Sequence, residues 1–273
     1  MPLRADSLHE FLPSVAAPER PPIDGSRVAV VVAHPDDETI GCGALLQRLS
    51  GVHVVVVTDG APRDLQDAHW HGFETAEDYA AARSRELHNV MQVADVRQII
   101  QFGVPDQQAV LNLAQITQRL QRILADRRTR IVLTHAYEGG HPDHDAVAFC
   151  VHQAVRRAPP LGIVEVPLYR ATETGAVHQS FASAAGIEPV VTDLTAEEQR
   201  HKREMVAKYV TQTDVLAGFS LAAEVFRIAP HYDFTKPPNG GRVLYDRERW
   251  GIDSKAWLRH AHEVLAQEGA LCG

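Results

Sequence analysis

The sequence has 273 residues, of which 45% are hydrophobic and 23% are charged. This composition is close to that of an average globular protein, so a sizeable core can form and wholesale disorder is excluded. The 27 basic and 35 acidic residues give a formal net charge of −8. This charge argues against nucleic acid or an anionic membrane surface as the main partner, because both require a basic footprint. The length fits one large domain, or one domain with extensions.

Cysteine content and hydropathy indicate a soluble cytoplasmic protein. The cysteines are odd in number, far apart and without a C-x-x-C pair, which favours a reducing compartment: Cys42, Cys150 and Cys272. The first 22 residues mix charges and prolines, unlike a signal peptide. The strongly apolar stretches 27–33 and 52–57 are far shorter than the roughly 20 residues that cross a bilayer. Oligomeric state stays open, and a homo-oligomer is compatible with the sequence.

Strands and helices alternate from residue 27 to residue 156, after a Pro-rich segment that predicts an arm at 1–25. β-branched apolar runs and helical spacing predict these elements, each strand being followed by a helix: strands 27–33, 53–58, 97–102 and 130–134, helices 41–50, 77–93, 112–125 and 145–156. This alternation is typical of a parallel sheet with helices on both faces. We therefore predict an α/β fold, Rossmann-like, with a mostly parallel sheet.

The rhythm changes after Pro160. Further strands are expected at 164–170 and 189–192, and further helices at 196–209 and 254–267. We expect a single α/β domain over residues 26–273, with a catalytic core at about 26–190 and a C-terminal extension at about 190–273.

The segment 61–75, APRDLQDAHWHGFET, is too long for an ordinary connection. One hypothesis is a lid in which Trp70 forms an aromatic wall against a sugar ring. The alternative is a surface loop anchored by one buried tryptophan.

Polar clusters follow the first and fourth predicted strands, AHPDDE at 33–38 and THAYEGGHPDHDA at 134–146. Ligands bind at the carboxyl ends of strands in open α/β sheets. Two histidines and a carboxylate around an open position are a typical catalytic zinc set, and adjacent carboxylates are costly unless a cation neutralises them. Each cluster by itself could instead be a turn followed by a helix N-cap.

The pair AHPDDE and HPDH (141–144) resembles the signature of the PIG-L/LmbE-like zinc-dependent N-deacetylases. Members of that family deacetylate N-acetylglucosaminyl compounds of lipid, inositol and malate, and antibiotic sugars. The resemblance covers residues 27–157, with weaker similarity in KYVTQT (208–213) and EVFR (224–227).

The resemblance implies a role for each motif residue. His34, Asp37 and His144 would bind zinc, although Fe²⁺ or another divalent metal suits the same set. Asp36 would act as the general base. His141 would stabilise the oxyanion or protonate the leaving amine.

Other positions in the two motifs have two interpretations. Asp143 could orient His141, or it could be the N-cap of the following helix. Glu38 is expected near the ligands or at the helix start, not as a ligand. Some relatives carry a tyrosine where this chain has Gly139, and Tyr137 is the nearest phenol, so tyrosine assistance to the oxyanion stays open.

Two substrate contacts are proposed outside the motifs. Arg83 resembles a family arginine that reaches the substrate; the alternative is an exposed ion pair with Glu86. Asp106 follows the third strand and could accept a hydrogen bond from a sugar hydroxyl, or it could be an ordinary turn residue.

The predicted function is a zinc hydrolase that removes an acetyl group from an N-acetylated amino sugar or glycoside. An amidase that cleaves a larger amide or a thiol conjugate would use the same groups, and a metal-binding pseudo-enzyme is a further alternative. A hydride-transfer enzyme is disfavoured because the first strand leads into AHPDDE and not into G-x-G-x-x-G.

Overall fold

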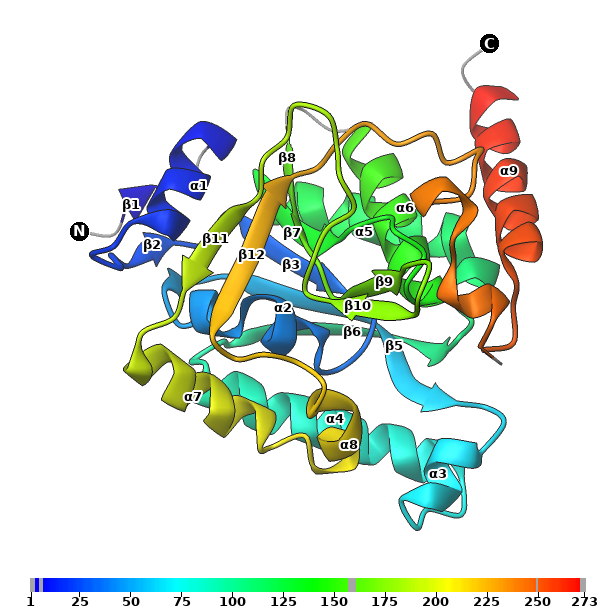
Figure 1. Ribbon diagram of the computed structural model, residues 1–273, viewed down its shortest axis with the longest axis horizontal. Helices are drawn as coiled ribbons and strands as arrows, with labels where there is room; N and C mark the ends of the chain where they lie inside the picture. The colour runs from blue at the N-terminus through cyan, green and yellow to red at the C-terminus, as the bar shows by residue number, and fades with distance from the viewer. Residues whose placement is uncertain (1–2, 5–6, 157–160, 249, 271–273) are drawn as a thin grey trace.

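The computed structural model describes residues 3–4, 7–156, 161–248 and 250–270. A seven-stranded sheet forms its centre (Figure 1). In spatial order the strands are β11 (Val190–Asp193), β12 (Ala223–Ile228), β8 (Gly162–Val166), β7 (Ile131–His135), β3 (Val28–Val32), β5 (His53–Pro62) and β6 (Gln98–Asp106). The strands from β8 to β6 are parallel, whereas β12 and β11 pair antiparallel at one edge. The predicted fold class is confirmed.

Alternate residues of the central strands supply two separate hydrophobic cores. Val28, Val30 and Val32 pack on one face of the sheet, and Ala29 and Val31 pack on the other. Because successive side chains of a strand point to opposite faces, such a continuous apolar run requires helices on both sides. The first face is covered by α1 (Leu8–Ala16), α2 (Asp37–Leu46), α4 (Ala76–Val93) and α7 (Ala196–Val206), and the second by α5 (Leu113–Asp126), α6 (Pro142–Arg156) and α9 (Ser254–Ala270) (Figure 1).

The strand order fixes where a ligand can bind. The chain leaves β3 through α2 and returns as β5 on one side of β3, whereas β7 lies on its other side. The direction of winding therefore reverses between β3 and β7, and the crevice at such a switch point is the usual ligand site. The two motif loops follow these two strands.

The N-terminal segment contributes to the core. Helix α1 buries Phe11 and Val15 against the first face, with Pro13 inside the helix. A small sheet joins β1 (Leu3–Arg4), β2 (Ile23–Asp24) and β4 (Leu49–Ser50). The expected division of the chain into an arm, a core and an extension stays a prediction.

The segment 61–75 is ordered around a short helix. β5 continues to Pro62, and α3 (Gln66–Trp70) follows. Trp70 is 79% exposed, so the alternative in which a buried tryptophan anchors the loop is wrong.

Within the part of the chain that the structure describes, no helix is long and apolar enough to span a membrane.

The C-terminal region adds several short elements. A hairpin joins β9 (Tyr169–Ala171) and β10 (Ala176–His178). The remaining elements are single turns of helix: η1 (Ala109–Asn112), η2 (Val210–Gln212), α8 (Thr213–Leu216), η3 (Asn239–Gly241) and η4 (Leu244–Asp246). Strand β12, which contains EVFR, has no counterpart among the predicted elements, because a strand of six residues gives little periodicity.

Buried ion pairs hold the C-terminal region against α2. Glu224 of β12 accepts hydrogen bonds from the backbone N–H groups of Ala44 and Leu45, at 2.7 and 3.1 Å. Lys202 of α7 donates to the same carboxylate at 2.7 Å, and neither side chain is more than 2% exposed. The EVFR segment is thus attached to the end of α2 by the buried carboxylate of Glu224.

Replacing Glu224 with alanine should therefore destabilise the protein strongly. The change leaves the Lys202 ammonium buried without its counter-charge, which typically costs about 3–5 kcal/mol. Glu197→Ala is the matched control, because that carboxylate is 75% exposed and its pairing with Arg200 should contribute less than about 1 kcal/mol. Equilibrium urea unfolding measures both variants. Equal losses for the two would contradict this account.

Candidate metal centre

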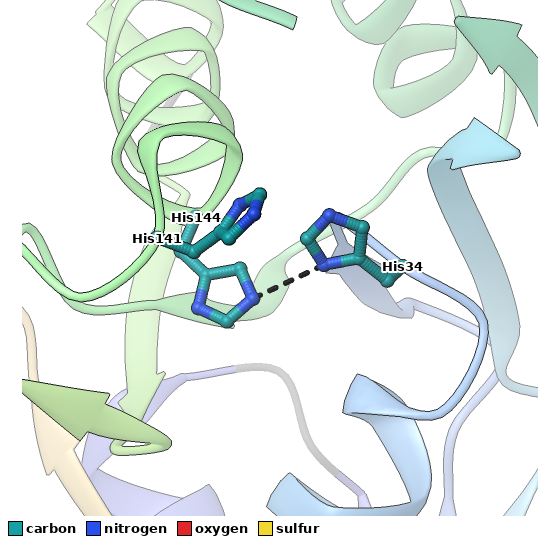
Figure 2. Close-up of side chains that lie close together, drawn as sticks. All are labelled: His34, His141 and His144. Carbon is teal, nitrogen blue, oxygen red and sulfur yellow. Dashed lines mark hydrogen bonds between the residues drawn. The ribbon is translucent and has the colours of Figure 1, made fainter. Parts of the chain in front are cut away.

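Three predicted ligands converge at the switch point. His34 follows β3, Asp37 opens α2, and His144 lies in the first turn of α6. His34 Nδ1 lies 3.2 Å from His144 Nε2 and 3.3 Å from Asp37 Oδ2, and His144 Nε2 lies 3.3 Å from Asp37 Oδ1. Figure 2 shows His34 facing His141 and His144 across this space.

The spacing of these atoms suits a cation of the size of zinc. Ligands at about 2.0–2.1 Å in tetrahedral geometry are about 3.3–3.4 Å from one another. His34 Nδ1 and His144 Nε2 have nearly this separation from each other, and each of them has it from one of the two Asp37 carboxylate oxygens. All three side chains are buried. Two groups of side chains that could hold a metal ion share His144: one joins it to His34 and His141, and the other joins it to Asp37 and His135. The donors of this cluster therefore fit a divalent metal.

Asp106 orients the first ligand. The carboxylate ends β6, and its Oδ1 lies 2.9 Å from His34 Nε2. A ligating histidine usually gives its second ring N–H to a carboxylate, which fixes the tautomer and leaves the other nitrogen free for the metal. Here Nε2–H of His34 points to Asp106, and Nδ1 is the nitrogen that faces Asp37 and His144. Asp106 is thus occupied by His34, and the alternative of a simple turn residue is wrong.

Asp143 supports the same region through the backbone. Its two oxygens accept hydrogen bonds from the N–H groups of Gln107 and Ala109, at 2.6 and 3.0 Å, and Oδ2 lies 3.5 Å from His34 Nε2. Asp143 lies inside the first turn of α6, so the N-cap interpretation is wrong. Its carboxylate holds the loop after β6. The contact with His141 comes instead from the Asp143 backbone N–H, at 3.2 Å.

His141 presents a neutral ring to the cavity. Because Nδ1 accepts the Asp143 N–H, the ring proton of a neutral imidazole resides on Nε2. Burial, together with nearby His34, holds the pKa of His141 well below its usual value, which favours this neutral form. The Trp250 ring packs against it, with centroids 4.7 Å apart.

Asp36 lies beside the ligands in a strained backbone conformation. Its φ of 133° is one that side-chain-bearing residues rarely adopt, and such strain is concentrated at functional sites. The Glu38 carboxylate stabilises the turn by accepting the Asp36 N–H at 3.0 Å. Burial and the adjacent Asp37 carboxylate raise the pKa of Asp36 to about 7, although Arg83 opposes the shift.

Arg83 reaches the centre from α4. It is 2% exposed and its Nη2 donates to Asp36 Oδ2 at 3.1 Å. The alternative of an exposed ion pair with Glu86 is wrong, because Glu86 is buried and accepts hydrogen bonds from Thr211. Among the described residues, Nε and Nη1 of Arg83 have no hydrogen-bond partner. The lack of a side chain at Gly60 gives the guanidinium room, since a Cβ there would lie 2.7 Å from Arg83 Nε.

His135 is a central residue to which sequence reasoning gave no role. It ends β7, and its Nε2 accepts the Ala33 N–H at 2.9 Å, which ties together the two motif loops. The ring stacks on His144 with centroids 4.2 Å apart and an interplanar angle of 2°. Its position at a strand end, in the same cluster as the ligands, is the signal that could have identified it.

The loop before His141 explains the absence of a tyrosine there. Gly139 has a φ of +72°, and a Cβ would lie 2.4 Å from the Val243 side chain. Tyr137 donates to the Lys236 carbonyl and is not among the described residues that line the cavity. Tyr169 of β9 does line it, 5.3 Å from the His144 ring, and is the phenol that sequence reasoning missed.

One cavity unites these groups. Its described lining includes all the proposed ligands together with Asp36, Arg83, Asp106 and His141. Trp70 is not among the described lining residues, so the structure does not bring it to the site. Asp67, which lies three residues before Trp70 in α3, does line the cavity.

Comparison with known proteins agrees with this geometry. The family model PIG-L, described as GlcNAc-PI de-N-acetylase, matches residues 29–155, which include both motif loops. This part of the chain is therefore similar to the PIG-L family. One relative is the probable N-acetyl-α-D-glucosaminyl L-malate deacetylase 2 of Bacillus cereus, 24% identical over 193 residues, which are 69% of this chain and 84% of that protein.

Another relative comes from Saccharopolyspora erythraea. It is 1D-myo-inositol 2-acetamido-2-deoxy-α-D-glucopyranoside deacetylase 1, 25% identical over 237 residues, covering 75% of this chain and 76% of that protein. Among solved structures, a deacetylase of the teicoplanin biosynthesis pathway has a TM-score of 0.61 at 16% identity, covering 76% of this chain and 99% of that one. This chain therefore shares its fold with that enzyme.

Substituting Asp106 with asparagine should lower metal affinity by about 10- to 100-fold, because the amide holds His34 less firmly than the carboxylate does. His34→Ala should abolish binding. Competition with a chromophoric zinc chelator measures both.

Asp67→Asn is the matched control, since that carboxylate lines the same cavity and contacts none of the three ligands in the described structure. Unchanged affinity in the Asp106 variant would mean that His34 is positioned without it.

Proposed function

We propose that this protein is a metal-dependent deacetylase of the PIG-L family that hydrolyses an N-acetylated amino sugar or glycoside to acetate and a free amine. The observation that carries the proposal is the triangle of His34, Asp37 and His144 with the Asp36 carboxylate beside it. Deacetylases of N-acetylglucosaminyl compounds among its relatives support the substrate class.

His34, Asp37 and His144 would hold the cation. Zinc is the natural choice for two histidines and a carboxylate, and Fe²⁺ suits the same set. When bound, the cation supplies polarisation of the acetyl carbonyl and of the attacking water. The negative charge of Asp37 also needs this counter-charge, because it is buried only one residue from Asp36.

Asp36 would accept the proton of the attacking water as its oxygen bonds to the acetyl carbon. The residue is adjacent to a ligand in sequence, yet its Oδ2 is paired with Arg83, which fixes the carboxylate beside the triangle. Glu38, held by Tyr209 at 2.6 Å, in turn fixes the Asp36 backbone. These contacts prepare the carboxylate for proton transfer without movement.

His141 would act as the hydrogen-bond donor. Its Nε2–H can stabilise the charge that develops on the acetyl oxygen, a contribution of about 10²- to 10³-fold in rate per donor. The same proton can pass to the nitrogen as the C–N bond breaks, which releases the amine. The unpaired N–H groups of Arg83 would then be available for a sugar hydroxyl.

A mass-spectrometric screen of N-acetylated sugars and glycosides tests the function directly. Loss of one acetyl group, with equimolar acetate and suppression by a chelator, is the expected result. Release of a larger acid from an amide or a thiol conjugate would point to an amidase instead. Chelator-resistant hydrolysis would refute metal dependence.

Asp36→Ala should keep the metal and lose turnover by about 10²- to 10⁴-fold, because only the proton acceptor is removed. Metal content and kcat are measured on the same preparation. Asp64→Ala, at an exposed position, is the control and should behave as the unchanged protein. A fully active Asp36→Ala protein would show that another group is the base.

A further inference from the structure

The cavity has two chemically different sides. One holds the ligand triangle with Asp36, Arg83 and Asp106, and the other is formed by apolar side chains from the C-terminal part of the chain: Leu168, Val215, Leu216, Phe219 and Trp250. The deacetylation proposed above uses only the polar side. The apolar side is therefore available for a part of the substrate that does not react.

Tyr169 connects the ligand triangle with the apolar side. The Tyr169 ring is close to both His144 and Phe219, with ring centroids 5.3 Å from the first and 6.3 Å from the second. A two-carbon acyl group placed at the ligand triangle is too short to cross this ring. A substituent on the far side of a sugar ring is long enough.

Val215 marks the mouth of the apolar side. It lines the cavity and is 59% exposed, so its apolar side chain is accessible to a ligand. The segment that carries it is firmly held: Thr211 donates to Glu86 through both its backbone N–H and its hydroxyl, at 2.9 and 2.7 Å, and Gln212 donates to the Tyr79 hydroxyl at 2.8 Å. The exposed valine is thus presented by a fixed element.

The charges of the cavity disfavour an anionic substituent. The described lining contains the carboxylates of Asp36, Asp37, Asp67 and Asp106, whereas Arg83 is the one guanidinium among the described lining residues. Arg83 is already paired with Asp36. A divalent cation at the triangle would offset two of the four negative charges, so a carboxylate on the aglycone would still meet an acidic surface.

We propose that the substrate is an N-acetylated amino sugar with an uncharged, apolar aglycone that lies against Val215, Leu216 and Phe219. This inference rests on the proposed function, since it assumes that the acetyl group occupies the ligand triangle. It separates this chain from a deacetylase whose aglycone is a dicarboxylate.

Glycosides of N-acetylglucosamine that differ only in the aglycone test the proposal. The hexyl glycoside should exceed the methyl glycoside in kcat/KM by about tenfold, as expected when roughly two methylene groups leave water. The 5-carboxypentyl glycoside, of similar length but anionic, should lose this advantage. Calorimetry with the zinc-loaded protein measures the same order of binding independently of turnover.

Val215→Asp should lower the hexyl-to-methyl ratio to about one, because a carboxylate replaces the apolar surface at the mouth. Val210→Asp is the matched control: Val210 is also exposed, at 70%, lies five positions earlier and is outside the described lining of the cavity, so its ratio should stay at about ten.

Equal kcat/KM and affinity for the hexyl and methyl glycosides would overturn the inference, as would a preference for the 5-carboxypentyl compound. A preference for an N-hexanoyl over an N-acetyl group would also overturn it, because the apolar side would then hold the acyl chain. Tighter binding of the hexyl glycoside without acetate release would support this apolar site and refute the proposed function.

Discussion

The buried carboxylate of Asp37 is the constraint on which the centre depends. It accepts a hydrogen bond from the backbone N–H of His34 at 2.7 Å. Its oxygens also lie 3.4 Å from His135 Nε2 and 3.3 Å from His144 Nε2. One side chain therefore joins the loops that follow β3 and β7. Burial disfavours its charge, yet His144 and His135 hold the pKa of Asp37 well below its usual value. A buried anion with three histidines around it is a site prepared for a cation.

A second layer of polar contacts makes the C-terminal region part of the same centre. Tyr209 donates to Glu38, Thr211 to Glu86, and Lys202 to Glu224, and each of these carboxylates is buried on α2, α4 or β12. The weaker motifs in the C-terminal half thus contact the elements that carry the motif loops and Arg83. The same region also supplies the apolar side of the cavity.

Much of this could be predicted from local sequence. Buried parallel strands give continuous apolar runs, and the motif residues at the ends of two such runs must meet wherever the sheet reverses its winding. The ligand set His34, Asp37 and His144 followed from that reasoning together with the family resemblance, and the structure brings the three together. The environment of Arg83 and Asp106 was not accessible in this way, because it depends on partners distant in the chain.

The sequence by itself determined the α/β alternation, the family resemblance and the residue types of the centre, because each depends on short-range pattern and spacing. Only the tertiary structure decided that Asp106 orients His34, that Trp70 points to solvent, and that Tyr169 and Val215 line the cavity. Contacts between residues far apart in the chain leave no periodic signal. These contacts form when the elements pack together and each buried charged group is paired with a partner.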